Sequence, residues 1–150
     1  MSDINWQGVD IILCLAVSAL FLYISIRARQ HQKLCGAPWF AMLSAASAWV
    51  LLFYALEAAA GDHLALYLTL SKWEYIGQTV IPLAWLGFAL HFSGQEWQLR
   101  RRHEIALAVI PVITVVLAWT NEWHGLIWVQ PAFDLSARPP IFMPVYGLWF

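Results

Sequence analysis

The chain has 150 residues, of which 61% are hydrophobic and 11% are charged, and its formal net charge is −1. Soluble domains carry about 25% charged residues, and so apolar a chain excludes intrinsic disorder and argues against a soluble core at this length. Eight Lys and Arg against nine Asp and Glu leave no basic surplus, so we expect no nucleic-acid partner. The lipid bilayer is the expected environment.

Four apolar stretches reach or approach the length of about 20 residues that a helix needs to cross a bilayer. They cover residues 9–27, 38–60, 72–93 and 104–120, and the fourth is short enough to need local thinning of the bilayer. An outer loop over 121–145 follows, and a further apolar stretch begins at 146–150. The sequence predicts an all-α membrane protein with four transmembrane helices plus the start of a fifth, and we expect a fragment of a longer protein.

The charges between the spans predict the orientation. Arg27, Arg29 and Lys33 follow the first span, and the run 100–102 (RRR) follows the third. These two loops hold six of the eight basic residues, and loops rich in Lys and Arg stay in the cytoplasm. We therefore expect the N-terminus outside, in a multi-pass protein of the bacterial inner membrane.

Polar groups inside a bilayer are costly and usually face the interior of a helix bundle. In the second span, Trp49, Phe53 and Glu57 are spaced four residues apart and share one helix face. Glu57 stands within a turn of the end of this span. Two interpretations stay open, a carboxylate solvated at the outer interface and one that faces the bundle.

The third span carries one stripe at helical spacing, with polar residues at its outer end and aromatic residues deeper. Its members are Glu74, Gln78, Ile81, Trp85, Phe88 and Phe92. Pro82 lies mid-span, where its ring displaces the carbonyl of Gln78, and Pro111 takes the same position in the fourth span. We expect a hinge at each proline. The alternative is an aromatic packing seam with structural prolines.

The outer loop over 121–145 is rich in proline and aromatic residues, so it should pack as a cap and not as a flexible linker. Under this cap the sequence predicts an outward-facing ligand cleft, because ligand pockets combine apolar walls with a few convergent polar groups. The candidate ligand-binding residues are Glu57, Glu74, Gln78 and Trp85, roofed by Asn121, His124 and Trp128. The alternative is a set of interface acids with a belt of anchoring tryptophans.

Motifs for catalysis do not stand out in the sequence. We find no glycine-rich phosphate loop, no GxSxG and no His–Cys cluster at metal-ligand spacing. His103-Glu104 is like the phospho-acceptor box of histidine kinases, but it opens a predicted transmembrane span, where a kinase domain could not reach it. We therefore expect no catalytic residue, no metal and no cofactor in this chain, and no enzyme activity of its own.

Several short pieces, taken in order, cover nearly the whole chain and resemble a known family. They are Trp49–Glu57 (WVLLFYALE), Trp73–Gly77 leading to Pro82, Trp85 and Phe88, then Gly94, Pro111, Thr120-Asn121, His124, Trp128 and Tyr146-Gly147. The ordered set resembles the N-terminal seven-transmembrane sensor region of bacterial histidine kinases and related signalling proteins.

The resemblance implies about three more spans and then a cytoplasmic PAS, kinase or diguanylate cyclase module, as in two-component systems. It implies a membrane-embedded sensory input region that passes a ligand or membrane signal to this cytoplasmic effector. The implied partners are an unknown small ligand and the effector domain, and a second copy of the chain in a homodimer is a candidate.

Two other function classes compete with a sensor. A small four-helix transporter or channel subunit usually places an acid deep in an early span, as a proton or cation site. Here Asp10 stands at the edge of the first span, and Glu57 and Glu74 lie toward the outside, which weakens that interpretation. A membrane enzyme has no residue constellation to support it.

Overall fold

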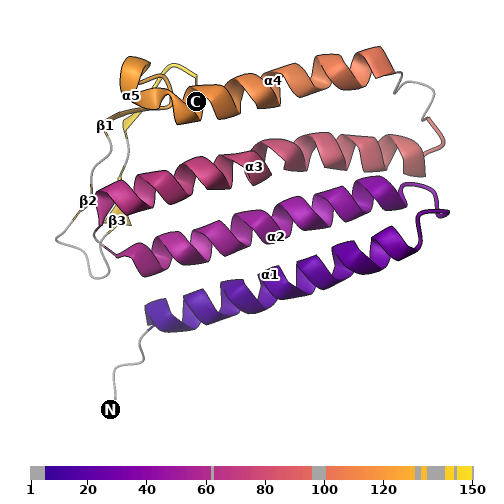
Figure 1. The fold of residues 1–150 in the computed structure, drawn as a ribbon, viewed down its shortest axis with the longest axis horizontal. Helices are drawn as coiled ribbons and strands as arrows, with labels where there is room; N and C mark the ends of the chain where they lie inside the picture. The colour runs from indigo at the N-terminus through magenta and orange to yellow at the C-terminus, as the bar shows by residue number, and fades with distance from the viewer. Residues whose placement is uncertain are drawn as a thin grey trace.

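The computed structural model describes residues 6–61, 63–95, 101–130, 133–134, 141–143 and 145–149. Four helices run antiparallel and side by side (Figure 1): α1 (Trp6–Gln30), α2 (Ala37–Ala60), α3 (Leu64–Phe92) and α4 (Arg101–Trp119). After them come a one-turn helix, α5 (Asn121–His124), and four short strands, β1 (Trp128–Gln130), β2 (Phe133–Asp134), β3 (Ile141–Phe142) and β4 (Val145–Tyr146). Helix thus dominates, as the sequence predicts.

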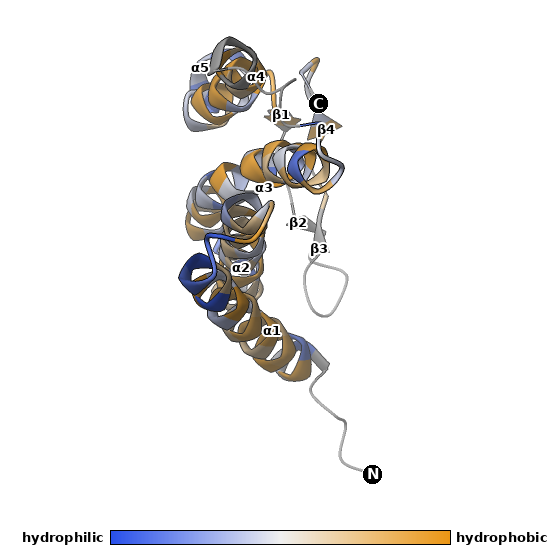
Figure 2. Ribbon diagram, turned by 90° about the vertical axis from the view of Figure 1, so that its right-hand side faces the viewer, coloured by the Kyte–Doolittle hydropathy of each residue, from blue (hydrophilic) through white to orange (hydrophobic). Residues whose placement is uncertain are grey.

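The helices form a single curved row in which each packs on its neighbour in sequence, with α1 and α4 at opposite ends (Figure 2). Helices α1, α2 and α3 are long and apolar enough to cross a membrane, whereas the apolar part of α4, Ile105–Trp119, is shorter. Large apolar side chains such as Ile12 and Val112 point outward and are more than half exposed. Such a surface suits lipid, so the expectation of a multi-pass, all-α membrane protein is confirmed.

The contact between α1 and α2 is built from small residues at a seven-residue repeat. The Ser18 hydroxyl donates to the carbonyl of Ala48, and the Ser25 hydroxyl donates to the carbonyl of Ala41, each at 2.7 Å. Both serines are buried. Small residues let membrane helices approach closely, because lipid tails supply no hydrophobic force that would otherwise hold two apolar helices together.

The contact between α2 and α3 depends on a glycine. A β-carbon added at Gly87 of α3 would overlap the indole ring of Trp39 in α2. Nearby, the rings of Phe40 and Phe88 lie 5.5 Å apart, and those of Phe88 and Phe92 lie 5.7 Å apart. Of the aromatic stripe on α3, Phe88 therefore packs against α2, whereas Phe92 is 75% exposed.

Helix α3 begins at Leu64, two turns before the span expected from residue 72. The residues from Leu64 to Ser71 include neither Pro nor Gly and are mainly apolar, so the helix continues through them. These two added turns place Tyr67 and Ser71 beside the end of α2, and this extension shapes the site described below. Pro82 and Pro111 both lie inside continuous helices.

The segment after α4 folds back on itself in two antiparallel strand pairs. Strand β1 pairs with β4, with Trp128 opposite Tyr146, and β2 pairs with β3, with Phe133 opposite Phe142. Tyr146 therefore lies in a strand. The sequence prediction of a fifth helix that begins at this residue is wrong. The reason is tertiary: Gly147 N–H donates to the carbonyl of Ile127 at 2.9 Å, which satisfies the backbone without the costly nucleation of a helix.

Candidate functional site

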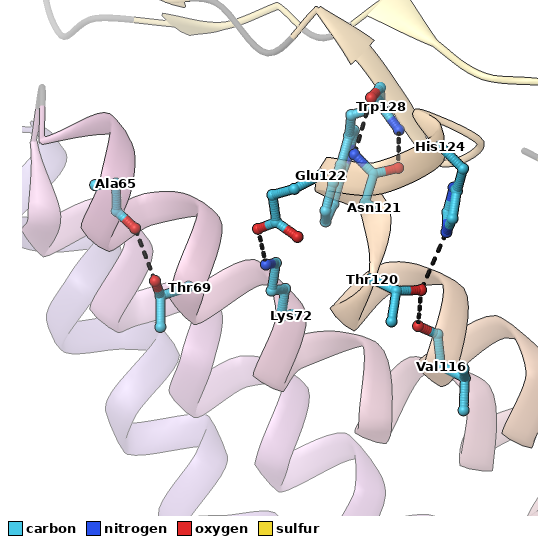
Figure 3. A network of polar contacts seen from close by, with 9 residues as sticks. All are labelled: Ala65, Thr69, Lys72, Val116, Thr120, Asn121, Glu122, His124 and Trp128. Carbon is cyan, nitrogen blue, oxygen red and sulfur yellow. Dashed lines mark hydrogen bonds and ion pairs between the residues drawn. The ribbon is translucent and has the colours of Figure 1, made fainter.

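The outer cap is organised by the Asn121 side chain. Its Nδ2 group donates to the carbonyl of Trp128 at 2.9 Å, and its Oδ1 atom accepts from the backbone N–H of Trp128 at 3.1 Å (Figure 3). The same Oδ1 atom also accepts from the backbone N–H of Ile127 at 2.9 Å. Asn121, Ile127 and Trp128 are all buried. Asn121 therefore holds the turn between α5 and β1, and these three bonds use its amide in the fold.

The Trp128 ring then fixes the cap on α3. It meets the ring of Tyr75 edge-on, with the ring centroids 5.4 Å apart, in a buried cluster that also contains Ala118 and Ile127. Aromatic pairs in this geometry add about 0.5–1.5 kcal/mol beyond the burial of their area. The cap is thus a packed part of the molecule, joined to the outer ends of α3 and α4.

His124 is held on both ring nitrogens, and Figure 3 shows the contact with Thr120. Its Nδ1 atom accepts from the N–H of Leu126 at 3.0 Å, and its Nε2 atom lies 3.0 Å from the hydroxyl of Thr120. That hydroxyl donates its one hydrogen to the carbonyl of Val116 at 2.7 Å, so it accepts from Nε2–H. The contacts assign the neutral imidazole with its proton on Nε2.

An ion pair joins the cap to the outer part of α3. The Lys72 ammonium group contacts the Glu122 carboxylate (Figure 3). The hydrogen bond from Lys72 is the main cause that lowers the pKa of Glu122 below its ordinary value of 4.5. A polar cleft of about 390 Å³ lies beside this pair, and its walls include Lys72, Asn121, Glu122, His124 and Trp128.

A second polar group lies between the outer parts of α2 and α3. Tyr67, Ser71, Glu74 and Gln78 follow one another at spacings of four, three and four residues, so they form one stripe on α3. Glu57 of α2 faces the first three of them. Its side chain is only 4% exposed, which excludes the solvated interface position that the sequence left open.

The stripe continues toward a cleft between α3 and α4. The Gln78 amide donates to the Glu74 carboxylate at 2.9 Å, and Gln78 also lines this cleft, whose volume is about 460 Å³. From α3 the walls are Tyr75, Gln78, Thr79, Pro82, Leu83 and Leu86, and from α4 they are Leu107, Ile110, Pro111 and Thr114. The walls are mostly apolar, with a few polar groups near the outer end.

Both helix prolines face this cleft together with the residues whose carbonyls they leave without a helix partner. Proline has no N–H, so Pro82 cannot bond to Gln78 and Pro111 cannot bond to Leu107. All four residues line the cleft. Each helix therefore lacks one backbone hydrogen bond, and the two gaps lie on opposite walls of the same cavity.

The structure divides the candidate ligand-binding residues into two groups and leaves Trp85 apart from both. Glu57, Glu74 and Gln78 come together between α2 and α3, whereas Asn121, His124 and Trp128 line the outer cleft. Trp85 is 60% exposed and lines neither cleft. The two groups adjoin through Tyr75, which touches Trp128 and lines the cleft between α3 and α4.

Sequence reasoning missed Tyr67 and Ser71. The signal was present, since both continue the Glu74–Gln78 stripe backward at helical spacing. It was hidden because the third span was expected to begin only at residue 72.

Aromatic side chains of α2, α3 and α4 pack against one another. The indole N–H of Trp49 donates to the carbonyl of Trp73 at 2.7 Å. The ring of Trp73 stacks with Phe53 at 6.2 Å and meets Trp119 edge-on at 4.9 Å. This aromatic group ties α2, α3 and α4 together at one level, so its contribution is packing and anchoring.

Comparison with known proteins gives one match. No curated protein and no solved structure matches this chain. The model of a family described as the N-terminal 7TM region of histidine kinase matches residues 11–150. This range includes the described parts of the four helices from Ile11 onward and the cap. The chain therefore belongs to the family of N-terminal seven-transmembrane regions of histidine kinases, a multi-pass membrane sensor region whose role is input and not catalysis.

Proposed function

We propose that this chain detects a small ligand or a state of the membrane in the cleft between α3 and α4, and passes the signal to a cytoplasmic kinase or diguanylate cyclase module. In this proposal the N-terminus lies outside, and the basic stretches Arg27 to Lys33 and 100–102 face the cytoplasm. The positive-inside bias of these stretches supports that orientation.

The observation that carries the proposal is the shared cleft of Pro82 and Pro111. A ligand shifts an equilibrium between two arrangements only if it binds one of them better than the other. A ligand between two helices that both yield at the cavity wall can do so, because a small change of angle at either proline alters the shape of the site. The inner ends of α3 and α4 would then move relative to each other.

The chemistry of the cleft indicates the kind of ligand. Leucine, isoleucine and proline side chains supply apolar walls, and the hydroxyls of Thr79 and Thr114 and the amide of Gln78 supply polar contacts. The carbonyls of Gln78 and Leu107, which lack a helix partner, offer acceptors. A largely apolar molecule with one or two hydrogen-bond donors fits this lining.

The remaining candidate residues take supporting roles in this proposal. Glu74 holds Gln78 through their hydrogen bond, and Glu57 lies behind Glu74. Asn121, His124 and Trp128 form the outer cap, which touches the cleft through Tyr75. A ligand entering from outside would pass this cap. Membership of a sensor family favours this function over the four-helix transporter or channel subunit.

The test uses the full-length protein that contains this region, with effector output measured with and without stimulus. Leu83→Trp fills the cleft, and Gln78→Ala removes the side-chain amide that lines it. Leu13→Trp adds the same bulk on α1, where Leu13 is 59% exposed, and serves as the matched control. We expect both cleft variants to shift output at least several-fold while they insert normally, and the control to respond like the parent.

Parental output from both cleft variants would refute the cleft as the input site. A change in output from Leu13→Trp as large as that from Leu83→Trp would also refute it, because the effect would then follow bulk in the membrane and not occupancy of the cleft.

A further inference from the structure

The strongest unexplained feature is a buried carboxyl group. Glu57 is 4% exposed, and its Oε1 atom has no hydrogen-bond partner among the described residues. A buried polar atom without a partner costs free energy, and a buried charge costs more. An atom of this kind in a membrane helix calls for a bound partner.

The group that Glu57 faces carries the same charge. The Glu57 and Glu74 side chains lie within hydrogen-bonding reach, and the hydroxyls of Ser71 and Tyr67 also face Glu57. Two ionised carboxylates at such a distance repel strongly where water is excluded. One positive charge between them would remove the repulsion and give the unpartnered oxygen a partner.

No cation of the described chain supplies that charge. Lys72, one residue beyond Ser71, is paired with Glu122. From α1, the neutral amide of Gln7 donates to the carbonyl of Ala58, the residue after Glu57, at 2.7 Å. The other titratable groups that act on the acids and on the adjoining tyrosines are themselves tyrosines, namely Tyr54 of α2, Tyr67 and Tyr75 of α3, and Tyr146 of β4.

A proton fits this position better than a larger ligand. Glu57 lines neither the cleft between α3 and α4 nor the outer cleft, so no cavity described here gives a molecule access to it. The described residues contain no group of three or more His, Cys, Asp and Glu that could hold a metal ion. A proton needs no cavity. A carboxylate can only accept hydrogen bonds, and once protonated it can also donate one.

We propose that Glu57 and Glu74 bind one proton between them, so that the Glu57 O–H donates to the Glu74 carboxylate and bridges α2 to α3. The proton comes from the outer aqueous phase and returns to it. When it leaves, two negative charges face each other and push the outer ends of α2 and α3 apart. Glu74 holds Gln78 on the wall of the ligand cleft, so the proton acts on the same helix that carries the proposed input site.

Glu57 and Glu74 can bind a proton whether or not the proposed function is correct. Only the effect of this proton on signalling rests on the proposed function. Infrared spectroscopy on the full-length protein in lipid vesicles detects the carbonyl stretch of a protonated carboxylic acid. We expect this band at neutral pH in the parent, with a shift on exchange into heavy water. Glu57→Gln, which keeps the size of the side chain, should abolish the band.

Glu74→Gln tests the sharing, because it replaces the charged carboxylate acceptor with a neutral amide and leaves Glu57 in place. We expect it to change the frequency of the band or the pH at which the band disappears. Glu122→Gln is the matched control, an acid in the cap, and should leave both unchanged. Circular dichroism establishes that each variant keeps its helices, and a misfolded Glu57→Gln leaves the Glu74→Gln result decisive.

Three outcomes would overturn the proposal. They are a parent without the band at neutral pH, a band that survives in well-folded Glu57→Gln, and a band that Glu74→Gln leaves unchanged. A band that appears only after treatment with a metal chelator belongs to the first outcome, since a metal ion would then occupy the site. Absence of the band from the parent, together with the expected effect of Leu83→Trp on output, refutes proton binding alone. A band in the parent that behaves as expected, together with parental output from both cleft variants, refutes the proposed function alone.

Discussion

Pro82 of α3 and Pro111 of α4 line the same cleft. Each proline removes one backbone hydrogen bond from its helix, to Gln78 and to Leu107 respectively, and both of these residues lie on the cleft wall as well. Prolines in neighbouring helices can lie on faces that point away from each other, but here both face the same cleft. A molecule held between them would contact both helices where each one bends most easily.

The orientation of the chain gives the first prediction. In a background without Cys14 and Cys35, Arg29→Cys and Arg101→Cys should stay unlabelled in intact cells by a membrane-impermeant thiol reagent, because both positions should face the cytoplasm. Trp123→Cys is the positive control, since Trp123 is 87% exposed on the opposite, outer end. Labelling of either arginine position from outside would reverse the topology.

The cap gives the second prediction. Asn121→Ala removes the partner of two buried N–H groups and one carbonyl, so it should destabilise the cap by about 1–3 kcal/mol. The amides of Ile127 and Trp128 should then exchange faster with heavy water. Thr69→Ala is the control, because its hydroxyl bonds only to Ala65 of its own helix in an exposed position (Figure 3). Unchanged exchange in Asn121→Ala would contradict the structural role of this side chain.

The packing of α2 against α3 gives the third prediction. Gly87→Ala forces a methyl group toward the indole of Trp39 and should lower the free energy of unfolding in mixed micelles by about 1–3 kcal/mol. In the double variant with Gly87→Ala and Trp39→Phe, the smaller ring leaves more room for the added methyl group. The loss in the free energy of unfolding should therefore be smaller than the sum of the losses in the two single variants, because the two sites are in contact. Ala19→Val adds bulk on the exposed face of α1 and should be nearly neutral. Additive effects at Gly87 and Trp39 would argue against this contact.

The ion pair of the cap gives the fourth prediction, a pH dependence. Lys72 lowers the pKa of Glu122, so the stabilisation from the pair is complete above the ordinary Glu value of 4.5 and is lost as the pH falls through the lowered one. The Glu122 side chain is 64% exposed, so solvent screening keeps the contribution below about 1 kcal/mol.

An NMR titration of the Glu122 carboxyl carbon measures this directly. The midpoint should lie lower in the parent than in Lys72→Met, and Lys33→Met, at the other end of the molecule, should leave it unchanged. Equal midpoints in the parent and Lys72→Met would show that the pair does not form in solution.

The sequence by itself was enough for the environment and the helices. Four apolar stretches and a charge content of 11% leave a bilayer as the place for this chain, and the structure has helices at all four positions. Local periodicity also placed Glu74 and Gln78 on one face, where they are hydrogen-bonded. The ordered motifs identified the family, which the match over residues 11–150 confirmed. These properties depend on composition and on neighbours within a few residues.

The tertiary structure decided which polar groups meet. Whether Glu57 is solvated depends on how far α3 extends alongside the last turn of α2, and two added turns bring Tyr67 and Ser71 beside it. The pairing of β1 with β4 in the same way put Tyr146 in a strand, and the contacts of Asn121 made it part of the cap. A helix pattern fixes the face on which a residue lies, but the offset between neighbouring helices follows from side-chain packing along their whole length, which no local stretch of sequence contains.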